Sequence, residues 1–114
     1  RPGSRRIAIK PQIVGDLNYA QAAVRTVRGT VAVDWTKGDN ALEMRVTIPV
    51  NTTAEISVPK MGFKEIAITE SGKTLWEAGT FARGVAGITA GRESGDEVIF
   101  DAGTGSYIFQ LIGQ

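Results

Sequence analysis

Acidic side chains are the groups in this sequence with the clearest capacity for chemistry. A pair of carboxyl groups, one protonated and one ionised, is what most enzymes use to cleave a glycosidic bond. Alternation places Glu43 and Glu55 on the solvent side of strands and Asp39 lies in a turn, so we interpret these as solvated charges. Asp16 follows a glycine, where a short acid bonds the backbone of a turn, and we keep it open as a candidate. The full set considered is Asp16, Asp34, Asp39, Glu43, Glu55 and Asp101.

Composition removes most other routes to catalysis. The chain has no histidine, which is the commonest general base and metal ligand and a member of every Ser-His triad. It has no cysteine, so disulfides and thiolate metal sites are excluded. We therefore predict no catalytic residue, no metal and no cofactor in this chain.

The sequence AITESGKT at residues 67–74 fits a relaxed phosphate-binding loop, with Ala67 in place of the first glycine. Such a loop works only when a helix N-terminus follows it and points at the phosphate. The five residues LWEAG at 75–79 are too short for that helix, and Gly103-Thr104-Gly105 also has no helix after it. We predict β-turns at both places.

Aromatic rings are the remaining candidates, because they stack on the apolar faces of sugars, and a shared platform could be built from Trp35, Trp76, Tyr19 and Tyr107. Trp35 follows the inward register of its strand and is predicted to lie in the core. The segment around Trp76 has no clear alternation. We keep Trp76 and Tyr19 as the residues that would contact a carbohydrate if this chain binds one.

Strands must position all of these residues. Residues 30–36 and 41–48 alternate apolar and polar side chains and flank Lys37-Gly38-Asp39-Asn40, which predicts an antiparallel hairpin with Trp35 buried. Further strands are expected at 6–9, 19–27, 54–58, 65–69, 98–100 and 107–112. The run at 107–112 is apolar at nearly every position, which is typical of a strand covered on both faces. The glycine-rich residues 79–95 predict bends and short edge strands.

Together these signals predict an all-β fold, a single antiparallel β-sandwich that is jelly-roll-like, over residues 1–114. The net charge is +1 and the basic residues are scattered, so we expect neither nucleic acid nor a membrane as a partner. The chain begins at Arg1 rather than Met, and we expect it to be a fragment or processed product of a larger protein. Nothing assigns a compartment.

The order and spacing of several short pieces resemble the C-terminal β-sandwich domain of bacterial α-L-rhamnosidases. One piece precedes Val14, most lie between Val14 and Pro59, and two follow Pro59. The matching pieces are RIAIKP at 6–11, GDL at 15–17, YA at 19–20, Gly29 and Trp35, IPVNTTA at 48–54, VP at 58–59, TESG at 69–72 and GSYIF at 105–109.

This resemblance implies a narrow role. Members of the family are inverting glycoside hydrolases whose acid and base lie on a separate (α/α)6 barrel, and none of the catalytic motifs of that barrel can be carried onto a position of this sequence. We therefore expect a non-catalytic accessory domain that packs on and stabilises the catalytic barrel of a parent enzyme. The alternative is a carbohydrate-binding module that holds rhamnose-containing glycans through exposed aromatic side chains.

Overall fold

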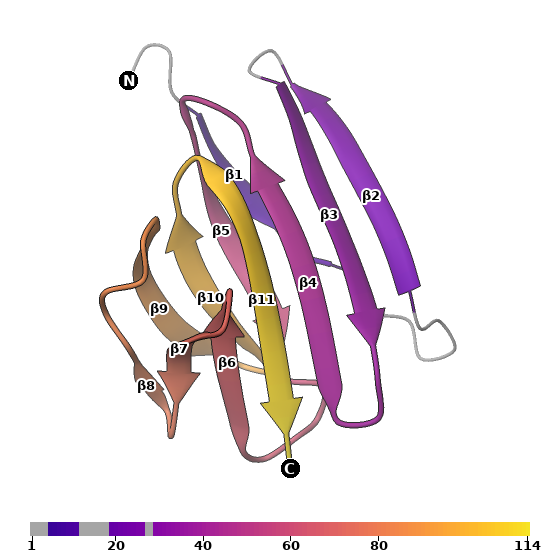
Figure 1. Cartoon of the computed structure of the whole chain (residues 1–114), viewed down its shortest axis with the longest axis vertical. Coiled ribbons are helices and arrows are strands. Elements are labelled where there is room, and N and C mark those ends of the chain that lie inside the picture. Colours follow the sequence, from indigo (N-terminus) through magenta and orange to yellow (C-terminus); the bar gives the residue numbers. More distant parts are fainter. Residues whose placement is uncertain (1–4, 12–18, 27–28) are drawn as a thin grey trace.

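The computed structural model describes residues 5–11, 19–26 and 29–114 and shows two β-sheets packed face to face (Figure 1). This confirms the predicted all-β sandwich. The strands are β1 Arg5–Ile9, β2 Tyr19–Thr26, β3 Gly29–Lys37, β4 Ala41–Ile48, β5 Thr52–Pro59, β6 Ile66–Glu70, β7 Lys73–Glu77, β8 Thr80–Phe81, β9 Ile88–Ser94, β10 Glu97–Ala102 and β11 Gly105–Gly113.

The two sheets differ in width. One has four strands in the order β1-β5-β10-β9, and the other has seven in the order β2-β3-β4-β11-β6-β7-β8. In Figure 1 the seven-stranded sheet lies in front, with β11 near its middle. The late strands β10 and β11 each have a neighbour on both sides, so both sheets are completed from the end of the chain.

The pairing is antiparallel except between β1 and β5, which run parallel. The sandwich is thus mainly antiparallel, as expected, with one parallel pair among the described strands. The reason is the connection: the chain leaves β1, builds β2, β3 and β4 in the other sheet, and returns to pair β5 with β1. A long crossover of this kind allows two strands to run in the same direction, which a tight hairpin does not.

The predicted hairpin of β3 and β4 is present. Trp35 pairs with Met44, and both are buried, as the alternation required. The turn is closed by the Gly38 amide, which donates to the Ala41 carbonyl oxygen at 2.8 Å. The expected edge strands in residues 79–95 are β8 and β9.

The core lies between the inner faces of the two sheets. Phe100 of β10 stacks on Phe109 of β11 with ring centroids 5.8 Å apart, and both rings are fully buried. Trp76 of β7 meets Phe100 edge-on at 6.4 Å. These contacts join the four-stranded sheet to the seven-stranded sheet in one hydrophobic cluster.

Strand β11 differs from its predicted environment. Tyr107, Phe109 and Leu111 are buried on the inner side, but Ile112 is 51% exposed on the other side. The strand is therefore covered on one face only. An apolar run does not distinguish single from double coverage, because sequence alone does not show whether an outward isoleucine has a neighbour above it.

Candidate functional site

Two of the candidate carboxylates do meet in the structure. Glu55 of β5 and Asp101 of β10 are directly opposite each other on the outer face of the four-stranded sheet. Arg6 of β1 contacts both, with its Nη2 atom 2.8 Å from Glu55 Oε2 and 3.0 Å from Asp101 Oδ1. Arg92 of β9 contacts the same two acids at 3.2 and 3.8 Å. Every strand of this sheet thus contributes one residue to the cluster.

We call this outer surface of the four-stranded sheet the charged face. Besides the cluster it carries an ion pair between Lys10 and Glu97 at 3.4 Å. Its members are Arg6, Lys10, Glu55, Arg92, Glu97 and Asp101. Sequence reasoning missed the cluster because Arg6 and Asp101 are 95 residues apart and only the strand order brings them together.

The electrostatics of the cluster oppose catalysis. Hydrogen bonds from Arg6 and then Arg92 hold the pKa of the Glu55 carboxyl below its usual value. A general acid in glycoside hydrolysis needs the opposite shift, which comes from burial or from a neighbouring like charge. With two guanidinium groups beside it and its face open to solvent, the pair Glu55 and Asp101 is suited to holding four strands together rather than to moving a proton.

The other acidic candidates are separate from that pair. Glu43 lies on the outer face of the seven-stranded sheet, where it accepts hydrogen bonds from Arg45 at 2.9 Å and Gln110 at 3.2 Å. These bonds, that from Arg45 first, lower the pKa of the Glu43 carboxyl. Asp34 lies opposite Arg45 on the neighbouring strand, and Asp39 is exposed in the β3–β4 turn. Asp16 lies outside the described residues.

Within the described ranges, no three acidic side chains gather in a way that would hold a metal ion. The same ranges contain no helix with the length and apolar character needed to cross a membrane.

The segment that resembles a phosphate-binding loop is a hairpin turn. Ser71 and Gly72 have φ values of 49° and 86°, which suit a tight turn between β6 and β7. Glu70 Oε2 accepts hydrogen bonds from the Ser71 hydroxyl at 2.6 Å and the Ile108 amide at 3.1 Å. The carboxylate therefore replaces a backbone carbonyl at the end of the β6–β11 ladder. Gly103 and Thr104 connect β10 to β11, with a bend at Thr104 and no helix after it.

The aromatic candidates do not form a shared platform. Trp35, Trp76 and Tyr107 are 4%, 4% and 5% exposed, whereas Tyr19 is 53% exposed. Tyr19 lies on β2 and Trp76 on β7, at opposite sides of the seven-stranded sheet. The alternation around Trp76 is broken by an irregularity in the β6–β7 pairing, which turns both Leu75 and Trp76 inward.

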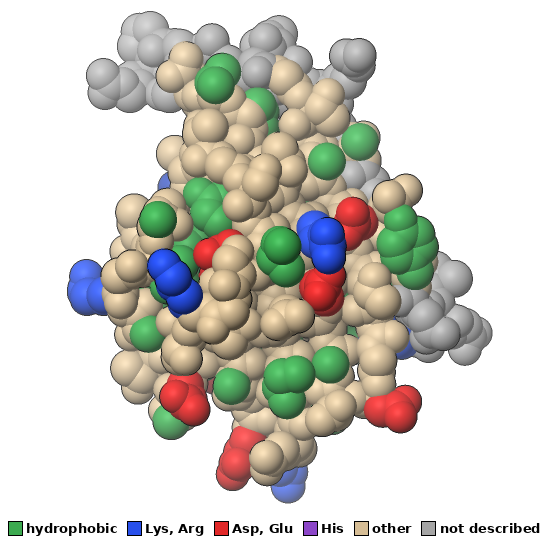
Figure 2. Space-filling model, viewed as in Figure 1, with side chains coloured by type: hydrophobic (Ala, Val, Ile, Leu, Met, Phe, Trp, Pro, Cys, Tyr) green, Lys and Arg blue, Asp and Glu red, His purple; other side chains and the backbone are tan. Residues whose placement is uncertain are grey.

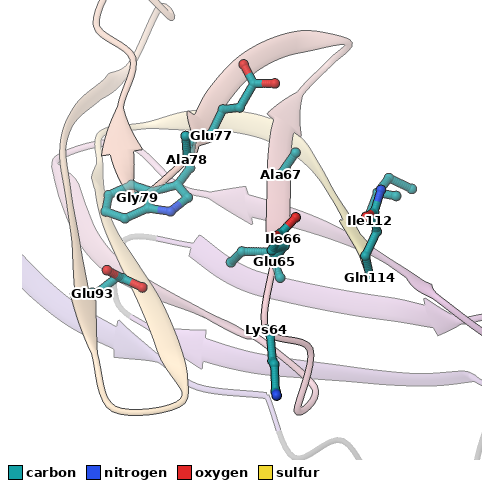
Figure 3. Close-up of a pocket in the computed structure, with 11 residues that line it drawn as sticks. Lys64, Glu65, Ile66, Ala67, Glu77, Ala78, Gly79, Glu93, Ile112 and Gln114 are labelled. Atoms are coloured by element: carbon teal, nitrogen blue, oxygen red, sulfur yellow. The ribbon is translucent and has the colours of Figure 1, made fainter.

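Trp76 nevertheless contributes to the wall of an open recess of about 620 Å³. Figure 3 shows that the carboxylates around this recess do not converge: Glu65, Glu77 and Glu93 point in different directions. The recess is lined by Lys64, Glu65, Ile66, Ala67, Trp76, Glu77, Ala78, Gly79, Glu93, Ile112 and Gln114. Sugar binding at Trp76 or Tyr19 stays a prediction.

The sequence of this chain matches one protein family and is similar to parts of two curated proteins. Residues 1–73 match the family described as bacterial alpha-L-rhamnosidase C-terminal domain. An alpha-L-rhamnosidase of Alteromonas sp. (strain LOR) is 31% identical over 70 residues, which is 61% of this chain and 8% of the relative. An alpha-L-rhamnosidase of Streptomyces avermitilis is 27% identical over 111 residues, which is 97% of this chain and 9% of the relative.

Solved structures agree with these matches. The structure of alpha-L-rhamnosidase from Dictyoglumus thermophilum superposes with a TM-score of 0.76 and 31% identity over 92% of this chain and 11% of that chain. The Streptomyces avermitilis alpha-L-rhamnosidase complexed with L-rhamnose gives a TM-score of 0.62 and 25% identity over 96% of this chain and 9% of that chain. The chain thus spans about a tenth of the length of these relatives. Since the family match covers more than half of its residues, the chain belongs to the bacterial α-L-rhamnosidase C-terminal domain family.

Proposed function

We propose that these 114 residues form one non-catalytic accessory domain of an α-L-rhamnosidase-like glycoside hydrolase, and that the domain packs on and stabilises the catalytic domain. The proposal rests mainly on how Glu55 and Asp101 are paired. Among the described residues, these are the two candidate carboxylates that lie opposite each other. Glu55 and Asp101 are each held by two arginines on an open face. The small share of the relatives' length that the chain spans supports the same conclusion.

The physical basis of such a role is binding linkage. A folded domain that contacts only the native form of its neighbour stabilises that native form. Interfaces between domains of one chain usually bury about 600–1,500 Å². A sandwich with a single rigid core is well suited to this role, because it presents a fixed surface at little entropic cost.

Two measurements test the proposal. The purified chain should give no turnover of an aryl α-L-rhamnoside above background, whereas the parent enzyme that contains it should hydrolyse this substrate. Deletion of these residues from the parent enzyme should lower the melting temperature of the catalytic domain. Turnover by the chain alone would contradict the non-catalytic role, and an unchanged melting temperature would contradict the stabilising role.

A carbohydrate-binding role is the second candidate: Tyr19 is 53% exposed, and Trp76, although only 4% exposed, borders the recess. Titration of the chain with L-rhamnose and rhamnose-containing glycans, followed by tryptophan fluorescence, tests this role directly. Saturable quenching that Trp76→Phe abolishes would support it, and the absence of any change at millimolar sugar would remove it.

A further inference from the structure

The outer surface of the seven-stranded sheet differs in kind from the charged face. On its four central strands β3, β4, β11 and β6, the only charged residues among those that point outward are Asp34, Glu43 and Arg45. The other outward side chains are small, hydroxyl-bearing, amide or aliphatic. We call this surface the seven-stranded face. Its central uncharged members are Thr30, Ala32, Thr36, Ala41, Thr47, Ala67, Thr69, Ser106, Ile108, Gln110 and Ile112.

Apolar side chains are left in solvent on this surface. Of the three large hydrophobic residues that are exposed in the described chain, Tyr19 and Ile112 belong to it, and Val50 lies in the turn after β4. Figure 2 looks onto this face and shows apolar side chains scattered across it, one group of acidic and basic side chains near its centre, and further charged side chains toward its left and lower edges.

The surface is also hollowed on both sides of that central group. One hollow of about 310 Å³ lies over β2, β3 and β4 and is lined in part by Ala23, Ala32 and Thr47. The other, of about 330 Å³, lies over β3, β4 and β11 and is lined in part by Ala41, Gln110 and Ile112. Arg45 borders the first and Glu43 the second. Shallow hollows with small side chains admit protruding side chains of a packed neighbour.

The two faces differ in the free energy that a neighbouring domain would gain or lose by covering them and removing their water. Covering the charged face would remove water from six ionised side chains whose pairing is already complete within the sheet, so the neighbour could offer little in return. Covering the four central strands of the seven-stranded face would desolvate three charges and bury the exposed Ile112 side chain, which is favourable.

The size of the surface fits a contact between domains. The molecule measures 43 × 32 × 24 Å, and this face spans its two longer dimensions. A surface of these dimensions offers on the order of 1,000 Å², which lies in the range of interfaces within one chain.

We propose that the seven-stranded face is the surface through which this domain packs on the catalytic domain of its parent enzyme. The proposal rests on the proposed function and adds the surface that performs it. The occupant is the remainder of the same polypeptide, because the relatives devote about nine tenths of their length to other parts. The charged face remains in solvent.

Cysteine accessibility tests this assignment, because the chain has no cysteine of its own. Thr47→Cys on β4 and Thr53→Cys on β5 form a matched pair. Both threonines are exposed and lie on strands with a neighbour on each side, but Thr47 points from the seven-stranded face and Thr53 from the charged face. Each variant of the parent enzyme is treated with a maleimide reagent under native conditions and in urea, and labelling of the tryptic peptide is followed by mass spectrometry.

We expect the Thr47→Cys variant to be labelled at least tenfold more slowly in the native enzyme than in urea, and the Thr53→Cys variant at similar rates in both. The reverse pattern would overturn the assignment of the face and leave the proposed packing role intact. Rapid native labelling of both variants would overturn this inference and, with an unchanged melting temperature after deletion of the domain, the proposed function as well. Protection of both would show that the sandwich is enclosed on two sides, which also overturns the assignment.

Discussion

The two outer faces of this sandwich cover the same core and yet are built from different chemistry. On the charged face, two arginines bridge two acids and each of the four strands contributes one side chain. On the seven-stranded face, one arginine bonds one glutamate while isoleucine and tyrosine side chains remain exposed. The core does not require this difference, because both sheets contribute their inner side chains to one hydrophobic cluster. The contrast shows that the fold sets the inner pattern and leaves the outer pattern free to serve a neighbour.

The contrast between the two outer faces depends on both sheets sharing one core. Substitution of the stacked Phe100 and Phe109 tests that shared core with the largest expected effect. We expect Phe100→Ala and Phe109→Ala each to lower the free energy of unfolding by about 3–5 kcal/mol, because each leaves a large cavity. Chemical denaturation of the chain measures this loss. The losses in the double variant should not add, because the two rings are in contact. A small loss at one site only would mean that the sheets have separate cores.

A substitution at Gly87, where the turn before β9 contacts Tyr107 of the other sheet, should lower the free energy of unfolding somewhat less. Gly87 has a φ of 85°, and a Cβ atom there would collide with the ring and hydroxyl of Tyr107 on β11. We expect Gly87→Ala to cost about 2–4 kcal/mol of unfolding free energy, from backbone strain and overpacking together. Gly72, with a φ of 86° and open space around it, is the matched control, and Gly72→Ala should cost only about 1–2 kcal/mol. Equal losses at the two sites would show that Tyr107 does not press on the turn before β9.

The two faces should also differ in how strongly their ion pairs depend on pH, with smaller changes in stability than those expected for the core substitutions. The folded-state pKa values of Glu55 and Glu43 are both lowered, so each stabilises the fold above the ordinary glutamate pKa of about 4.3, and that contribution is lost as the pH falls through the folded value. At neutral pH, Glu55→Gln should lower the melting temperature more than Glu43→Gln, because Glu55 contacts two guanidinium groups and Glu43 one.

Both differences from the unsubstituted chain should shrink as the solution is acidified below that value, and high salt should weaken them at neutral pH. Thermal melts across pH and ionic strength provide the measurement. A larger effect of Glu43→Gln, or effects that grow on acidification, would contradict this account of the charged face.

The smallest effect is expected for an outward residue of the seven-stranded face. In the chain alone, Ile112→Ser should change the free energy of unfolding by about 0.5 kcal/mol or less, because the side chain is half in solvent. Leu111→Ala, one residue earlier and fully buried, should cost about 2–5 kcal/mol. In the parent enzyme Ile112→Ser should lower the melting temperature clearly. The same small change in both contexts would indicate that Ile112 is not covered.

Much of this architecture was predictable, because it follows from alternation along single strands. The β3–β4 hairpin, the burial of Trp35 and the turn at Ser71 all depend on neighbours within a few residues. The assignment of strands to sheets was not predictable. Strand β5 follows β4 after three residues, yet it pairs with β1 in the other sheet.

The candidate site was less accessible to sequence reasoning. The cluster around Glu55 needs side chains from four strands, and no local pattern indicates which acid will meet which arginine. Glu70 shares the inward register of Ile66 and Ile68, and this could have identified it as a buried acid with hydrogen-bond partners. The burial of Trp76 depends on a pairing irregularity that breaks the alternation by which burial is predicted.

The central positions of β10 and β11 have a consequence for how the chain reaches its fold. As the polypeptide is synthesised, β2, β3 and β4 can pair early, but the free edge of β4 must wait for residues 105–112. Pairing across such long sequence separations is slow, and an open edge invites association with other chains meanwhile. Yield during expression should therefore depend on how quickly the last two strands arrive, even for substitutions that leave the finished domain as stable as before.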